Sequence, residues 1–130
     1  MGPPRNEHTD YRDPARIAEM EVLRDQIAAA PRPVVSDDMV LLRRAGVPVQ
    51  WEPAIFAELA NTGDWDERPF VALIRQRHFA FFVTSGQRGQ RLFDSRYNRA
   101  VADAMDAAYP VKRIVADYIV HLPAAERARN

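Results

Sequence analysis

The fold is decided by five consecutive apolar residues, Phe79-Ala80-Phe81-Phe82-Val83. Because they do not alternate with polar residues, they predict an interior strand that is covered on both faces. Two shorter patterns predict further strands: the pair Val34-Val35, and the alternating apolar residues of the segment 47–51. Pro48 cannot donate to a strand ladder, so we expect the segment that ends at Trp51 to be an edge strand.

Helical patterns lie between these strands. Asp13 and Pro14 predict a helix start, with Asp13 as the N-cap and Pro14 in the first turn. Gly46 predicts the end of the helix that follows Val34-Val35. Near the C-terminus, residues 113–115 and 118–122 predict a hairpin that turns at Ala116-Asp117. By the same reasoning we expect helices over residues 13–30, 37–45, 53–62, 66–76 and 95–109.

The alternation of strands and helices predicts an α/β fold. We expect a mostly parallel, three-layer sheet of Rossmann-like or flavodoxin-like order that ends in the C-terminal β-hairpin. The domain is expected to cover residues 13–123, between a flexible lead-in (1–12) and a flexible tail (124–130).

Composition excludes several classes of protein. The formal net charge is +0 and the basic residues are spread along the chain, so nothing indicates a nucleic-acid partner. The chain has no cysteine, which excludes disulfides and thiolate metal sites. No apolar run approaches the roughly 18 residues that a membrane span needs.

Polar residues follow the two apolar strands and form the first candidate site. Asp37 and Asp38 come after Val34-Val35, and Thr84 and Ser85 come after the central strand. If the two strands are parallel neighbours, these side chains meet at a topological switch point, where α/β folds bind ligands. With Glu52 they would offer three carboxylates to a divalent cation. The alternative is ordinary capping of a helix start.

The loop 85–91 carries the last candidate, Arg88, which together with two glycines suggests phosphate binding. The loop lacks both glycine-rich phosphate-binding motifs, so a solvated connection is the competing interpretation. The three histidines have no ligand spacing and no GxSxG motif is present. Trp51 and Trp65 could stack on a sugar, although packing in the core is the simpler expectation.

Three stretches, taken in order, carry a resemblance to a known family. They are Pro33-Val34-Val35-Ser36-Asp37-Asp38, Leu59-Ala60-Asn61-Thr62-Gly63-Asp64-Trp65-Asp66 and Arg77-His78-Phe79-Ala80-Phe81-Phe82-Val83, followed by a helix that ends in Ala108-Tyr109 and by the closing hairpin. This order resembles the soluble C-terminal domain of bacterial membrane glycosyltransferases of family 39 type, the GT-C enzymes similar to protein mannosyltransferases and aminoarabinose transferases. The resemblance covers residues 13–123.

The resemblance implies a role without catalysis for this chain. Such enzymes transfer a sugar from a polyprenyl-phosphate carrier, and their acidic catalytic residue and divalent cation belong to loops between early transmembrane helices. No catalytic residue and no cofactor is therefore carried onto this chain. The implied role is an accessory domain at the extracytoplasmic face of a bacterial membrane. Its implied partners are the transmembrane part of the parent enzyme and a glycan or lipid-linked acceptor.

Two other hypotheses remain open from the sequence. The first is a stand-alone ligand-binding or regulatory α/β domain with a cleft around Asp37, Asp38, Thr84 and Ser85. The second is a small metal-dependent enzyme, which requires Asp37, Asp38 and Glu52 to converge.

Overall fold

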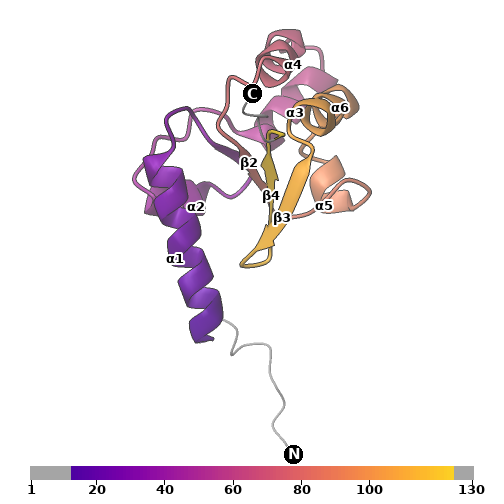
Figure 1. The fold of residues 1–130 in the computed structure, drawn as a ribbon. Coiled ribbons are helices and arrows are strands. Elements are labelled where there is room, and N and C mark those ends of the chain that lie inside the picture. Colours follow the sequence, from indigo (N-terminus) through magenta and orange to yellow (C-terminus); the bar gives the residue numbers. More distant parts are fainter. Residues whose placement is uncertain (1–12, 125–130) are drawn as a thin grey trace, which may run out of the picture.

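The computed structural model describes residues 13–124, so the expected lead-in (1–12) and nearly all of the expected tail lie outside the described residues. Four strands form one sheet in the order β1-β2-β4-β3, and Figure 1 shows β4 between β2 and β3. The strands are β1 (Val35–Ser36), β2 (Phe82–Thr84), β3 (Val111–Val115) and β4 (Tyr118–Leu122). The helices are α1 (Pro14–Ala29), α2 (Met39–Arg44), α3 (Pro53–Asn61), α4 (Arg68–Arg75), α5 (Arg91–Asp94) and α6 (Arg99–Ala108).

The α/β class is confirmed, but the expectation of a mostly parallel sheet is wrong. Only β1 and β2 pair in parallel, whereas β4 runs antiparallel to both β2 and β3. The reason is the C-terminal hairpin. It extends the sheet on the β2 side with its second strand, β4, lying antiparallel against β2, so that β3 becomes the edge.

Two local expectations also need correction. Residues 47–51 form no strand: Pro48 has no N–H to donate, and Val47 and Val49 instead pack against the core on the α1–α2 face. The predicted last helix begins at Arg99, as α6, rather than at residue 95, and residues 91–94 form a separate short helix, α5, that was not predicted. The central apolar stretch is interior as predicted, although the strand itself covers only residues 82–84.

Side chains of β2 alternate between two cores, one on each face of the sheet. Phe82 packs in a core with residues of α4 and α6, whereas Val83 packs in a second core with Leu23 and Ile27 of α1 and with α2. Figure 1 accordingly shows α1 and α2 on one side of the sheet and the remaining helices on the other. Covering on both faces explains why the stretch shows no polar alternation. Within residues 13–124, no helix has the length and apolar character that crossing a membrane requires.

The hairpin turn is held by α1. Ala116 and Asp117 both have positive φ, 49° and 73°, which is the backbone that two-residue hairpins favour and that these residue types adopt reluctantly. Glu19 accepts a hydrogen bond from Ala116 N at 2.7 Å. Arg16 donates to Ala116 O at 3.3 Å and forms an ion pair with Asp117. These contacts across the fold stabilise a turn that its own sequence favours weakly.

Tyr109 fixes the chain just before β2. Its hydroxyl donates to Phe79 O at 2.7 Å and accepts from Phe79 N at 3.2 Å, and the whole side chain is buried. Tyr97 is buried as well, but its hydroxyl has no hydrogen-bond partner among the described residues. Burial is the main cause that raises the pKa of Tyr97 well above its usual value.

The two tyrosines provide a matched pair of substitutions. Tyr109→Phe leaves two buried backbone groups of Phe79 without a partner, so we expect it to lower the free energy of unfolding by about 2–3 kcal/mol. Tyr97→Phe removes a hydroxyl that has no partner, so we expect unchanged or higher stability. Urea denaturation followed by circular dichroism measures both. Equal losses in the two variants would contradict this account.

Candidate functional site

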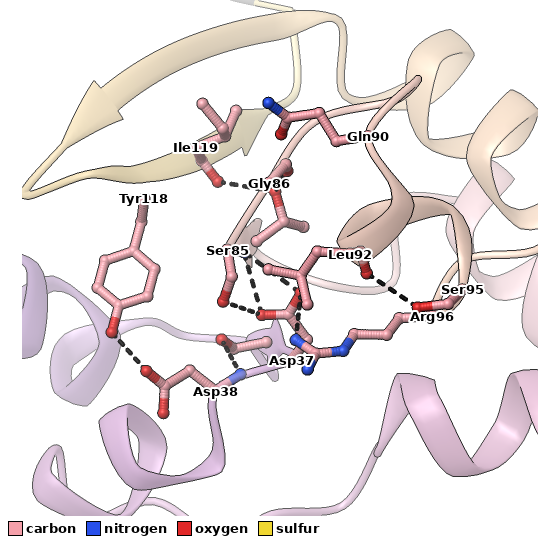
Figure 2. Close-up of polar contacts among 12 residues, drawn as sticks. Asp37, Asp38, Ser85, Gly86, Gln90, Leu92, Ser95, Arg96, Tyr118 and Ile119 are labelled. Atoms are coloured by element: carbon pink, nitrogen blue, oxygen red, sulfur yellow. Dashed lines mark hydrogen bonds and ion pairs between the residues drawn. The ribbon is translucent and has the colours of Figure 1, made fainter.

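The parallel pair β1–β2 brings Asp37 to Ser85, as the sequence predicted. The register pairs Val35 with Phe82 and Ser36 with Val83, so the two chains leave the sheet side by side. The Asp37 carboxylate is completely buried and accepts hydrogen bonds from Ser85 Oγ at 2.8 Å and Ser85 N at 3.1 Å (Figure 2). The guanidinium of Arg96 lies 3.5 Å from Asp37 Oδ2 and balances its charge.

Asp38 points the other way and serves as the N-cap of α2. Its Oδ1 accepts from Val40 N at 3.1 Å and Leu41 N at 3.3 Å, the bonds that an N-cap aspartate makes. Its Oδ2 accepts a hydrogen bond of 2.5 Å from the hydroxyl of Tyr118 on β4 (Figure 2). Burial first, and then this bond to a carboxylate, raise the pKa of Tyr118. Both oxygens of Asp38 are therefore engaged within the fold.

Glu52 and Arg88, two more of the predicted site residues, form no hydrogen bond or ion pair with Asp37 or Ser85 in the described part of the chain. Glu52 precedes α3 and makes no capping hydrogen bond, and it lines a pocket of about 110 Å³ together with Ser36 and Asp37. Arg88 pairs instead with Asp103 at 2.6 Å and Asp106 at 2.8 Å. The structure thus places Glu52 beside Asp37 across a small pocket, and Arg88 in a separate network of ion pairs.

The carboxylates do not assemble into a metal site. Among residues 13–124, no three histidine or acidic side chains are placed to hold one ion. Asp37 already accepts from Ser85, and Asp38 from α2 and Tyr118. The capping interpretation of Asp38 is correct, and the convergence of Asp37, Asp38 and Glu52 on a cation is not observed.

Thr84 belongs to a buried polar pair that sequence reasoning missed. Its hydroxyl donates its one proton to Gly86 O at 2.7 Å. His121 Nε2 lies 2.8 Å from the same oxygen, so we assign Nε2 as the protonated nitrogen that donates to Thr84. His121 Nδ1 is buried and has no partner among the described residues. Burial lowers the pKa of His121 to about 4, so the ring is neutral near pH 7.

Sequence patterns alone gave limited information about His121 and Arg96. The sequence placed residue 121 within a predicted strand, and only the observed register puts it opposite Phe82. Arg96 gave no such signal, because it comes from the break between α5 and α6, which the sequence pattern did not reveal. Trp51 and Trp65 pack against the core in stacked aromatic contacts with Phe70 and Phe56.

The geometry describes a structural lock more closely than a catalytic centre. Ser85 Oγ donates a hydrogen bond to the buried Asp37 carboxylate, which also contacts the Arg96 guanidinium. The Thr84 hydroxyl is completely buried and donates to a backbone carbonyl. A nucleophile needs an adjacent base and access to its target, and the buried Thr84 hydroxyl lacks that access.

Comparisons with known proteins identify no relative. No family model matches the chain, and neither a curated protein nor a solved structure matches it. The functional argument therefore depends on the residues and the geometry described above.

Removing the Asp37 carboxylate is expected to destabilise the fold strongly. Asp37→Ala leaves Ser85 N–H and the Arg96 guanidinium without their acceptor. Loss of one partner of a fully buried ion pair costs about 3–5 kcal/mol, and because Arg96 keeps some access to water we expect about 2–3 kcal/mol. Asp103→Ala, which breaks the exposed pair with Arg88, is the control and should cost much less. Urea denaturation distinguishes the two, and similar losses would argue against the lock.

Acid should weaken the fold through His121. Its folded pKa is about 4, below the ordinary value of 6.5, so the unfolded chain binds the proton first. Stability is therefore fully present above about pH 6.5 and falls by about 3 kcal/mol as the pH drops to about 4. His121→Gln, which can still donate to Thr84, should flatten this part of the stability profile. Unfolding measured from pH 4 to 7.5 tests this, with the exposed His78→Gln as a control whose profile should match the wild type.

Proposed function

We propose that this chain is a non-catalytic accessory domain of a polyprenyl-phosphate-sugar-dependent membrane glycosyltransferase, acting at the extracytoplasmic face of a bacterial membrane. In this proposal the domain packs against the transmembrane part of the enzyme and assists binding of the acceptor or of a partner. The proposal starts from the ordered sequence stretches that resemble the C-terminal domain of family 39-type enzymes.

One structural observation carries the non-catalytic part of the proposal. The polar residues that could have formed a site, Asp37, Asp38 and Thr84, are bonded inside the chain and hold strands, helices and loops together. Residues used in this way explain why Ser36-Asp37-Asp38 matters to the fold without being chemically active. They support the proposal that this domain contributes a binding surface.

The stand-alone ligand-binding hypothesis is less well supported. The pocket beside Asp37 and Glu52 has a volume of about 110 Å³ and is lined largely by apolar groups. Sites for small molecules usually measure about 300–1,000 Å³ and present several convergent polar groups. A larger groove of about 720 Å³ exists on this chain, but it lies between α1 and the hairpin, and none of the candidate site residues lines it.

The gene that encodes the chain provides the first test. We expect its reading frame to continue upstream of residue 1 with about a dozen apolar segments, each near 20 residues long. In the enzyme thus identified, removal of residues 13–123 should lower transfer to the acceptor, and the isolated chain should transfer no sugar. A start codon at Met1 without upstream membrane segments, or sugar transfer by the isolated chain, would refute the proposal.

A further inference from the structure

Strand β3 leaves one edge of the sheet open. It pairs with β4 alone, from Val115 opposite Tyr118 to Val111 opposite Leu122. Because the turn has two residues, the backbone N–H and C=O groups of Val115 and Tyr118 bond to each other. Along the hairpin, pairs of this kind alternate with pairs whose backbone groups point away from the partner strand. The N–H and C=O groups of Lys112 and Ile114 therefore point away from β4. Among residues 13–124, no backbone or side-chain group outside the sheet bonds to them.

The side chains on this strand are unusually exposed for a strand of its composition. Ile114 is 76% exposed, the highest value among the large apolar side chains that the structure describes, and Val111 is also exposed. Lys112 forms an ion pair with Asp106, whereas Arg113 has no ion-pair partner in the described part of the chain. An edge of this kind readily accepts a further strand, because its row of donors and acceptors is already arranged for pairing.

A second observation, independent of the edge, comes from the face of the sheet. The groove of about 720 Å³ lies between α1 and the hairpin, and Arg113 and Val115 of β3 contribute to its lining. Its floor is apolar and includes Phe81, Val120 and Leu122. Side chains of a strand alternate between the two faces of a sheet. A strand added outside β3 would therefore place every second side chain beside this groove.

Charge indicates the chemistry of the added strand. Arg32 and Arg113 line the groove, and no acidic residue does. A segment that carries a carboxylate opposite Arg113 and apolar residues on either side would complement both features. A second copy of this chain pairs poorly in the two central registers, because antiparallel pairing about residue 112 or 113 puts lysine on lysine or arginine on arginine.

We propose that the outer edge of β3 binds an extended segment of a partner protein, which adds a fifth strand to the sheet. The segment carries acidic residues opposite Lys112 and Arg113, and its apolar side chains occupy the groove under α1. This inference deepens the proposed function, because it names the surface through which the accessory domain holds a partner. Its test uses only the isolated chain, so its failure would leave the gene-level test of the glycosyltransferase assignment intact.

The test uses a peptide that matches the edge residue by residue. We would titrate the ¹⁵N-labelled chain with acetyl-Ser-Val-Thr-Glu-Glu-Val-Ser-amide, whose glutamates fall opposite Arg113 and Lys112 in antiparallel pairing. The expected result is a saturable shift of the Lys112 and Ile114 amide signals, together with slower hydrogen exchange at both. The same peptide with two lysines in place of the glutamates should not bind. Absence of binding, or equal binding of the two peptides, would overturn the proposal.

Substitutions in the strand test the pairing itself. Ile114→Pro removes an outward N–H that the hairpin does not use, so it should weaken binding by at least about tenfold, whereas Ile114→Thr keeps the donor and should bind as the wild type does. Arg113→Glu tests the charge without altering the backbone, and should remove the preference between the two peptides, because Lys112 still attracts one glutamate while the new carboxylate repels the other. Unfolding curves confirm that each variant is folded. Undiminished binding by both Ile114→Pro and Arg113→Glu would refute the edge site. Dimerisation of the wild type through this edge, measured by light scattering, would replace the proposal with self-association.

Discussion

The fold depends on a very short parallel contact, the pairing of β1 with β2. Only two residue pairs form this ladder, which is too little to secure two segments that lie 46 residues apart in the chain. The buried Asp37 adds what the ladder lacks, because it bonds both the backbone and the hydroxyl of Ser85 and also contacts Arg96. Helix α1 precedes β1 in the chain and α2 follows it. The contact of Asp37 with Ser85 and Arg96 therefore also fixes the position of these two helices, which form one layer.

A second set of polar contacts ties the same layer to the C-terminal hairpin. Asp38 caps α2 and accepts from Tyr118 on β4, while Arg16 and Glu19 of α1 bind the turn at residues 116–117. The hairpin is thus held at its turn and at the start of β4, although its turn residues are poor formers of positive-φ backbone. Hydrogen bonds between distant segments compensate for weak local preferences, which explains why charged and hydroxyl residues contribute here to the fold.

Much of this arrangement was predictable from the sequence, and the parts that were not have a common cause. The interior strand, the hairpin with its turn, and the approach of Asp37 to Ser85 all follow from local patterns joined with one rule about parallel strands. The insertion of β4 between β2 and β3 does not, because apolar periodicity specifies which face of a strand is buried and says nothing about its neighbours. The same limit applies to Arg96 and to the Thr84–His121 pair, whose roles exist only after distant segments pack together.

The distribution of bonded and open groups favours function by recognition. Thr84 and His121 are buried and bonded to each other, and the buried carboxylate of Asp37 is held by Ser85 and Arg96. The open hydrogen-bonding groups lie on β3, beside an apolar groove lined by two arginines. A protein that shields its reactive groups and exposes a strand edge is suited to holding another chain. This argument does not depend on any family assignment, because it uses only which atoms are bonded and which remain accessible.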